Sequence, residues 1–434
     1  MLITGGGAGA HPRWFAAPGR LLDGIVCWAR GFSADFWRFF AAAFFFDFGF
    51  GLFFFLFSLY LTDLHFNERS IGQIMASLTL GNVAGTIPAM FAVRRYGLQK
   101  PLLLSFFAAP LLCSLRVFAL RQQEQVALAF LTGIALCCWP VCFSPAVARF
   151  PNDRNRASGF SIVFATGIGL GCLAGLAGGY LPRMLQSHAA EGLFIAGMRS
   201  VLLLACGIVL LGILPLWKMA RDTGPVVSMR ALRLFHPFLF RFFPPFIIWN
   251  VVTGSFTTFG AIYLMKIIGL PLTRVGAVFS FSQLLQFFAV LASPVLFRRF
   301  GTLKGVSMAQ AATGIFLLLI CSTKSAAPSV VYFLGFSGVQ WMCGPGIYRY
   351  LMDHIPEPER STAWAVQNIS GALCQAATAA VTGGCIVHFG YSAVMIGNAV
   401  FALVAAAFFL ALPRGAEDAQ EMLMTGESTP SPTN

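Results

Sequence analysis

Twelve apolar stretches, separated by short polar turns, occupy most of the chain. A helix needs about 17–25 predominantly apolar residues to cross the hydrocarbon core of a bilayer. Each stretch meets or approaches that length, and they are Arg38–Leu61, Ile71–Val93, Pro101–Leu120, Val126–Ala148, Ser158–Leu181, Val201–Trp217, Pro245–Met265, Val275–Phe297, Gly305–Cys321, Ser329–Tyr350, Thr362–Val387 and Tyr391–Leu412. Charged residues make up only 10% of the chain, against about a quarter in soluble proteins. The sequence therefore predicts an all-α integral membrane protein with twelve transmembrane helices.

A basic turn occurs twice at an interval of half the chain. Arg94-Arg95-Tyr96-Gly97 is echoed at Arg298-Arg299-Phe300-Gly301, 204 residues later. A lysine follows each copy three residues on, at Lys100 and Lys304. Each copy also lies between two apolar stretches. The repeat predicts two similar halves in tandem, an arrangement typical of secondary transporters whose substrate site lies between the repeats.

Other positions repeat with nearly the same spacing and extend the alignment of the halves. The matched pairs are Gly51 with Gly254, Tyr60 with Tyr263, Gly72 with Gly276, Trp139 with Trp341, and Pro145 with Pro345. The expected divisions are a cytoplasmic N-terminal segment (1–35), an N-terminal six-helix bundle (36–217), a central cytoplasmic loop (218–243), a C-terminal six-helix bundle (244–413) and a disordered cytoplasmic tail (414–434).

The chain has a formal net charge of +13, and its positively charged residues are unequally divided between the two sides of the membrane. With the N-terminus inside, about 21 of the 29 Lys and Arg residues fall on the cytoplasmic side, as the positive-inside rule predicts. The charge therefore reports topology and does not indicate nucleic acid. We expect a multi-pass protein of the plasma (cytoplasmic, or inner) membrane, with both termini in the cytoplasm, membrane lipid as its surroundings and a monomeric state.

This arrangement resembles the major facilitator superfamily, with six plus six spans, a long central loop and a basic turn after the second and eighth spans. In the family's turn an Asp stands where this chain has Arg94, whereas Arg95, Gly97 and Lys100 fit the pattern. The resemblance implies alternating access controlled by charge contacts at the cytoplasmic turns. The gating residues that it implies are Arg94, Arg95, Gly97, Lys100, Arg298, Arg299 and Gly301, with Asp153, Arg156, Glu359 and Arg360 in the turns after the fourth and tenth spans.

Asp47 is the one carboxylate that lies deep in a predicted span. At about 1.5 Å per residue it sits on the order of 14 Å from Arg38, near the middle of the bilayer. Ionisable residues at that depth are candidate functional sites by default. An acid there can take up and release a proton as the protein opens to either side, so Asp47 is the candidate for proton coupling. The alternative is a protonated Asp47 that only bonds a neighbouring helix.

The symmetry counterpart of Asp47 is Asn250, which cannot titrate, and both precede a glycine by one helical turn. Uncharged groups at similar depth complete the predicted substrate site: Asn250, Trp139, Trp341, Gln340, Gln283 and Gln367. The two tryptophans are favoured because proline-interrupted helices in matching positions often flank such sites. Since no Lys or Arg lies at mid-span, a neutral, cationic or amphiphilic small organic substrate fits best.

The leading interpretation is a proton-coupled transporter of a small molecule that needs no cofactor and binds no metal. Cys137, Cys138 and Cys142 lack the His or carboxylate that would suggest a metal site. An uncoupled facilitator of the same fold is the nearest alternative. A membrane enzyme needs a catalytic cluster, for which the loop residues His65 and Glu68 are weak candidates. A non-transporting sensor needs a soluble domain, which the chain does not offer.

Overall fold

The computed structural model describes residues 32–149, 156–185, 192–219, 237–356 and 359–413. Helices occupy nearly all of these ranges. They are α2 (Ala34–Asp63), α3 (Glu68–Tyr96), α4 (Gln99–Phe118), α5 (Gln122–Leu136), α6 (Cys138–Arg149), α7 (Arg156–Met184), α8 (Gly192–Leu211), α9 (Ile213–Trp217), α10 (Pro237–Lys266), α11 (Leu272–Phe300), α12 (Thr302–Ser322), α13 (Ala326–Asp353) and α14 (Arg360–Leu410).

The predicted twelve spans are confirmed. The fourth span is broken into α5 and α6 at Cys137, and the sixth into α8 and α9 at Gly212. The eleventh and twelfth spans run together as α14, with a kink at Gly390 where φ is 79°. Among the described residues, ten helical segments are long and apolar enough to cross a membrane when α14 is counted once. The 28-residue α13 is the remaining span.

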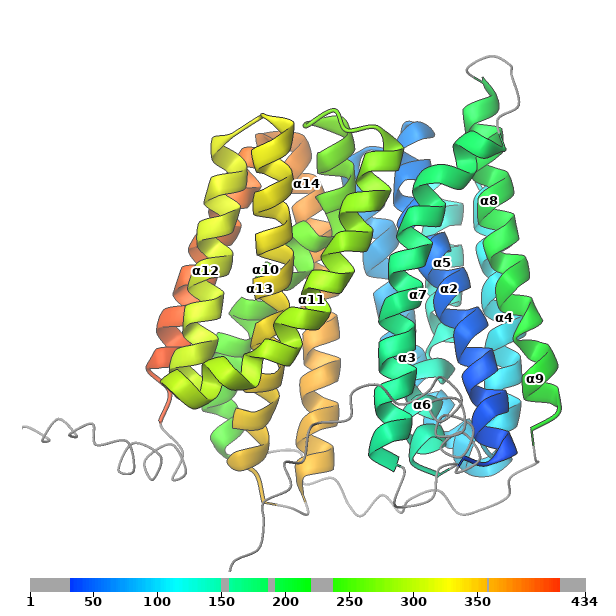
Figure 1. Cartoon of the computed structure of the whole chain (residues 1–434), viewed down its shortest axis with the longest axis horizontal. Helices are drawn as coiled ribbons and strands as arrows, with labels where there is room; N and C mark the ends of the chain where they lie inside the picture. Colours follow the sequence, from blue (N-terminus) through cyan, green and yellow to red (C-terminus); the bar gives the residue numbers. More distant parts are fainter. Residues whose placement is uncertain (1–31, 150–155, 186–191, 220–236, 357–358, 414–434) are drawn as a thin grey trace, which may run out of the picture.

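The helices form two bundles, with α2–α9 in one and α10–α14 in the other (Figure 1). Matching hydrogen bonds show that the bundles are built alike. The Tyr60 hydroxyl donates to the Val117 carbonyl at 2.8 Å, and the Tyr263 hydroxyl donates to the Ile320 carbonyl at 3.5 Å. Each bond joins the first span of its bundle to the third. We call these bundles the N-half and the C-half.

Both basic turns depend on a glycine with a positive φ angle. Gly97 ends α3 with φ at 76°, and Gly301 ends α11 with φ at 80°. Side chains disfavour positive φ, so glycine is the residue that lets the chain reverse here. Both turns lie at the face where α2 begins and α14 ends (Figure 1). We call it the basic-turn face and the other the opposite face.

Two boundaries differ from those expected. The sixth span begins at Gly192, before the predicted Val201, so the preceding loop is shorter than the sequence suggested. The seventh begins at Pro237, inside the interval 218–243 expected as the central loop. The first helical position tolerates proline because its N–H would be unpaired there anyway. Pro244 and Pro245, which mark the expected start, are instead included within α10.

The halves pack together through glycines in two matching places. A Cβ on Gly72 of α3 would collide with the Ala379 carbonyl of α14. In the related position, a Cβ on Gly276 of α11 would collide with the Gly175 carbonyl of α7. These positions lie toward the opposite face, since Gly72 and Gly276 are near the starts of their helices. Close backbone approach therefore joins α3 to α14 and α7 to α11 on that side.

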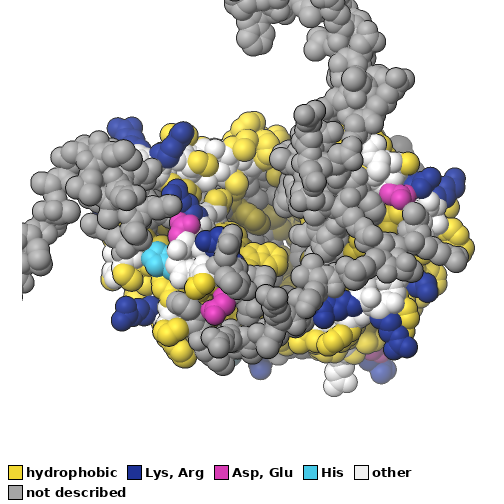
Figure 2. All heavy atoms as spheres, turned by 90° about the horizontal axis from the view of Figure 1, so that it is seen from below, with side chains coloured by type: hydrophobic (Ala, Val, Ile, Leu, Met, Phe, Trp, Pro, Cys, Tyr) yellow, Lys and Arg dark blue, Asp and Glu magenta, His cyan; other side chains and the backbone are white. Residues whose placement is uncertain are grey.

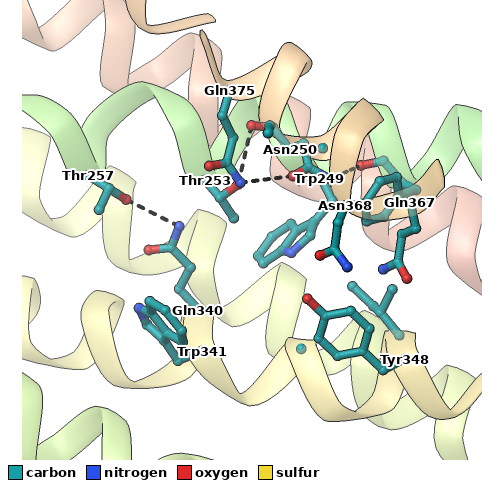
Figure 3. Close-up of a pocket in the computed structure, with 15 residues that line it drawn as sticks. Trp249, Asn250, Thr253, Thr257, Gln340, Trp341, Tyr348, Gln367, Asn368 and Gln375 are labelled. Atoms are coloured by element: carbon teal, nitrogen blue, oxygen red, sulfur yellow. Dashed lines mark hydrogen bonds between the residues drawn. The ribbon is translucent and has the colours of Figure 1, made fainter. Parts of the chain in front are cut away.

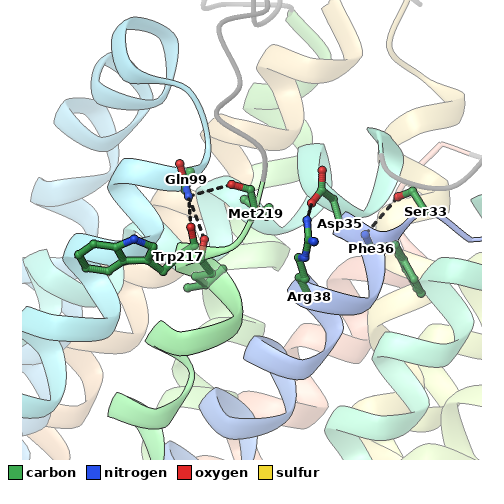
Figure 4. Close-up of polar contacts among 8 residues, drawn as sticks. Ser33, Asp35, Phe36, Arg38, Gln99, Trp217 and Met219 are labelled. Carbon is green, nitrogen blue, oxygen red and sulfur yellow. Dashed lines mark hydrogen bonds and ion pairs between the residues drawn. The ribbon is translucent and has the colours of Figure 1, made fainter.

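Gln99 holds the end of α9, the last helix of the N-half, in place. Its Nε2 donates to the carbonyls of Leu216, Trp217 and Met219 at 3.0, 3.1 and 2.9 Å (Figure 4). Carbonyls at a helix C-terminus have no partner within the helix. The Gln99 amide supplies one and holds the end of α9 against the start of α4.

Replacing Gln99 with Leu should lower the melting temperature of the purified protein, because buried carbonyls would lose their donor. We expect a decrease of about 2–6 °C, measured by thermal unfolding in detergent. Gln123→Leu is the matched control, since Gln123 is exposed on α5. An equal decrease in both variants would contradict this role for Gln99.

Candidate functional site

A cavity of about 400 Å³ lies within the C-half, between α10, α13 and α14. Its wall combines aromatic rings with side-chain amides and hydroxyls (Figure 3). These are Trp249, Asn250, Thr253, Thr257, Gln340, Trp341, Tyr348, Gln367, Asn368 and Gln375. The residues that line the cavity include no Asp, Glu, Lys, Arg or His. The cavity therefore combines an apolar surface with uncharged polar groups.

One part of the wall is already ordered by hydrogen bonds. Gln375 Nε2 donates to Asn250 Oδ1 at 3.0 Å and to Thr253 Oγ1 at 3.4 Å. Asn250 Nδ2 donates in turn to the Phe246 carbonyl at 2.8 Å. Because each donor has an acceptor before any solute arrives, these amides hold fixed orientations.

In a second part of the wall, formed by Gln367 and Gln340, some hydrogen-bonding groups are unpaired or only weakly paired. Gln367 is only 2% exposed, and among the described residues its Oε1 has no hydrogen-bond partner. A buried polar atom without a partner costs free energy. Across the cavity, Gln340 Nε2 donates to Thr257 Oγ1 at a long 3.4 Å. In the view of Figure 3 the Trp249 indole lies between the side chains of Gln340 and Gln367.

Four of the six predicted substrate residues come together in this cavity: Asn250, Gln340, Trp341 and Gln367. Trp139 lies elsewhere, in the N-half. It stacks on Phe46 of α2 with ring centroids 4.3 Å apart, and on Phe39 at 5.4 Å. Its indole thus packs within an aromatic cluster. Gln283 of α11 also lies outside the cavity, against α7.

Asp47 and Asn250 occupy corresponding places, as the alignment predicted. A Cβ on Gly167 of α7 would lie 3.1 Å from Asp47 Oδ2, and a Cβ on Gly371 of α14 would lie 3.2 Å from Asn250 Oδ1. In each half a bare glycine leaves room for a polar side chain of the first span. Asp47 is half-buried, and within the described part of the chain no cation or hydrogen-bond donor pairs with its carboxylate.

An ion pair joins the halves at the opposite face. Lys266 Nζ of α10 lies 2.6 Å from Glu68 Oε1 of α3, and the Tyr391 hydroxyl of α14 donates to the same oxygen at 3.3 Å. Glu68 is 7% exposed, whereas the Lys266 side chain is 48% exposed, so water reaches the pair from the lysine side only. We call Glu68, Lys266 and Tyr391 the interhalf latch.

This latch was not predicted from the sequence, in which Glu68 stands out only beside His65 as a weak enzyme candidate. The alignment of the halves gave no help, because the counterpart of Glu68 is Leu272. Opposite charges at span ends on one membrane side were the available signal, since Glu68 begins α3 and Lys266 ends α10.

Four of the predicted gating residues contact groups of their own half. Arg95 and Lys100 each lie 5.5 Å from the Tyr96 ring centre, and Arg299 lies 5.5 Å from that of Phe300. Arg360 Nε donates to the carbonyls of Met352 and Ile355. The remaining members are Arg94 near the end of α3, Arg298 near the end of α11, Gly97 and Gly301 in the turns, and Glu359 at the N-cap of α14. Asp153 lies outside the described residues, as does the side chain of Arg156.

The basic-turn face is hollowed between the halves. Figure 2 looks onto this face and shows hydrophobic side chains in the depth of the hollow, with Lys and Arg side chains around its rim. The glycine contacts and the interhalf latch lie on the other side. The described structure is therefore closed at the opposite face and open toward the basic turns.

Two bundles related by an internal repeat, joined at one face and hollowed at the other, define the class of secondary transporters. The family profile described as Major Facilitator Superfamily matches residues 39–379. The chain belongs to the major facilitator superfamily, as the resemblance in the sequence indicated. The family indicates a transporter and not an enzyme. No curated protein sequence matches the chain significantly.

Solved structures of transporters have the same fold at low sequence identity. A mutant of the nucleoside transporter NupG is 13% identical with a TM-score of 0.73, and the match covers 87% of this chain and 99% of that one. A D-xylose–proton symporter is 15% identical with a TM-score of 0.71, covering 88% and 98%. A bacterial homologue of the human lysosomal transporter Spinster, inward-facing and occupied, is 15% identical with a TM-score of 0.66, covering 96% and 100%.

Proposed function

We propose that this protein moves a neutral, polar organic solute across the membrane by alternating access, with proton coupling through Asp47. The uncharged, amide-lined cavity in the C-half is the observation that carries the proposal. The Asn250–Gln375 pair presents a preset polar edge, and Trp341 and Tyr348 offer ring surfaces that are 54% and 42% exposed. Apolar walls with a few fixed polar groups are typical of small-molecule sites.

The cavity favours a neutral solute that can donate a hydrogen bond. A charged group moved to this depth without a counter-charge costs about 2.5–3.5 kcal/mol even by insertion scales. The unpartnered Oε1 of Gln367 needs a donor. A solute hydroxyl meets that need, and it also accepts from an amide nitrogen. NupG is described as a nucleoside transporter and another relative in fold as a D-xylose symporter, and both kinds of solute carry hydroxyl groups on a ring.

Alternating access requires the interhalf latch to open. In the described conformation Glu68, Lys266 and Tyr391 hold α3 against α10 and α14 at the opposite face. If the basic turns are cytoplasmic, as their charge predicts, this conformation is inward-facing. Separating the halves at this face, at the glycine contacts as well as at the latch, then exposes the cavity to the other side. The latch breaks in that step.

Proton coupling is assigned to Asp47 because it is a half-buried carboxylate in the first span with no counter-ion in the described structure. Dehydration disfavours its charged form, so exposure of the site to water on one side or the other changes its protonation. The uncoupled facilitator remains the alternative. The two differ in whether transport follows an imposed pH gradient.

Asp47→Asn should abolish accumulation driven by a pH gradient while leaving solute exchange intact. The measurement uses purified protein in liposomes with a panel of sugars, nucleosides, amino acids, drugs and amphiphiles. Asp63→Asn, which changes an acid at the end of the same helix, is the control. Undiminished accumulation in Asp47→Asn would favour the uncoupled facilitator.

Gln367→Leu and Trp341→Ala should weaken solute binding about 10- to 100-fold, because each removes a group that faces the cavity. Binding of the transported solute is measured by isothermal titration calorimetry in detergent. The controls are Gln310→Leu, a fully buried glutamine of α12 that also lacks partners, and Trp217→Ala, a tryptophan that is 74% exposed. Equal losses in the controls would place the solute elsewhere.

Glu68→Gln should shift the protein toward the conformation open at the opposite face. Losing a partly shielded charge pair costs about 1–3 kcal/mol, which corresponds to roughly a 5- to 150-fold change in population. Hydrogen–deuterium exchange should quicken at the start of α3 and in the middle of α14. Exchanging the two charges (Glu68→Lys with Lys266→Glu) should restore protection. Glu124→Gln, from an exposed pair with Arg121 inside the N-half, should have no effect.

A further inference from the structure

The surroundings of Asp47 can be compared, position by position, with those of Asn250. Both side chains face a bare glycine on a helix of their own half, Gly167 for Asp47 and Gly371 for Asn250. One turn further along, the halves differ. In the C-half that position is Gln375, whose amide donates to Asn250 at 3.0 Å. In the N-half it is Gly171, which has no side chain to offer.

A side chain from the C-half occupies the space next to Gly171. Gln283 of α11 lies there, with its Nε2 2.9 Å from where a Cβ on Gly171 would be. The glutamine that the C-half carries on α14 thus has its N-half equivalent on a helix across the interface. Gln283 is half-buried, and it has no hydrogen-bond partner among the described residues.

The neighbouring turn of α11 fixes the register of Gln283. Ser280 Oγ donates to the Cys172 carbonyl of α7 at 2.6 Å. Ser280 and Gln283 are three residues apart, so they lie on the same face of α11. Gly167, Gly171 and Gly175 follow one another at four-residue intervals on α7 and present one bare face. Asp47 reaches this face from one side, and Gln283 and Ser280 reach it from the other.

We propose that Gln283 is the positioning residue for Asp47 and acts across the interface between the halves, as Gln375 acts on Asn250 within the C-half. The proposal rests on the proposed proton coupling through Asp47. When the halves move, the Gln283 amide slides along the bare face of α7 and pairs with the Asp47 carboxyl group. The conformation of the halves then depends on whether that group carries a proton.

The physical reason is the difference between a neutral and a charged acid at a closing interface. A protonated carboxyl group and a primary amide each donate and accept, so they satisfy one another as water leaves. A carboxylate only accepts hydrogen bonds. Removing water from it costs free energy, and a single neutral neighbour offsets only a small part of that cost. Closure of α11 over Asp47 is therefore favoured after a proton has bound. Gln283, expected as a substrate contact, takes a different role.

Few other titratable groups lie near this level of the membrane. On the helices packed against α2 they are the thiols Cys113 of α4, Cys172 of α7, Cys206 of α8, and Cys138 and Cys142 of α6. The described charged groups of these helices lie toward the faces: Arg116, Arg183, Arg199, Lys266, Glu68 and Arg69 toward the opposite face, and Arg94, Arg95, Lys100 and Arg241 toward the basic-turn face. Arg116 is fully buried and lies over the Phe57 ring, ten residues along α2 from Asp47. Gln283 is thus placed to act on Asp47 without competition from a nearby charge.

The test places charges at position 283 and follows the titration of Asp47 by infrared spectroscopy of the purified protein. The Asp47 carboxyl band is identified by its loss in Asp47→Asn. Gln283→Glu should move the pH midpoint of that band upward by about one to two pH units, and Gln283→Lys should move it downward by a similar amount. Gln286→Glu and Gln286→Lys are the controls. Gln286 is on the same helix, but its amide donates to Ser337 within the C-half at 2.6 Å.

A second pair of variants keeps the test decisive if charges at position 283 prevent folding. Gly171→Ala should displace the Gln283 amide and shift the Asp47 midpoint, whereas Gly169→Ala should not, because a Cβ there meets nothing within 4 Å. Equal midpoints in the 283 and 286 variants, or in the two glycine variants, would overturn the pairing. If Asp47→Asn removes no titrating band, proton coupling through Asp47 fails instead, so the two failures are distinguishable.

Discussion

Contact between bare helix backbones determines how the two halves of this protein can be arranged. At Gly72 and Gly276 any side chain would strike a carbonyl of the facing helix. Lipid gives helices no hydrophobic reason to associate, so packing of this closeness is a main source of affinity between membrane helices. The contacts are also smooth, since no side chain interlocks at those two points. They hold the halves together at the closed face, and with no interlocked side chains at these points the facing helices can separate again, which alternating access requires.

The sequence predicted the fold well because its signals are strong in a membrane protein. Length and apolarity predicted the spans, and the repeated basic turn aligned the halves closely enough to pair Asp47 with Asn250. Boundaries were less predictable. Pro244 and Pro245 suggested the start of a helix that in fact begins at Pro237. Proline interrupts the hydrogen bonds of a helix without always ending it when neighbouring helices support the segment.

The candidate site was predicted only where the halves are symmetric or where depth alone was informative. Gln340 and Gln367 were identified by depth, and both line the cavity. Trp139 was chosen as the counterpart of Trp341, but α2 brings Phe46 against it and the position becomes part of an aromatic core. The pairing of Glu68 with Lys266 links residues 198 apart in sequence. No repeat or periodicity encodes that contact, because it depends on which faces of the two halves meet.

The asymmetry between the halves bears on how two sites can be coupled. The amide-lined cavity belongs to the C-half, whereas Asp47 belongs to the N-half, lies beside Gly167 of α7 and is not among the lining residues. A proton on Asp47 therefore has no need to touch the solute to affect its movement. In the proposed coupling, what the proton changes is the free energy of bringing α11 against α7, and α11 belongs to the same half as the cavity. A ligand shifts a conformational equilibrium only through its different affinities for the two states. The proton and the solute are therefore coupled if each binds one arrangement of the halves better than the other. Under the proposed coupling, the α7–α11 interface is the shared element through which the proton and the solute affect each other.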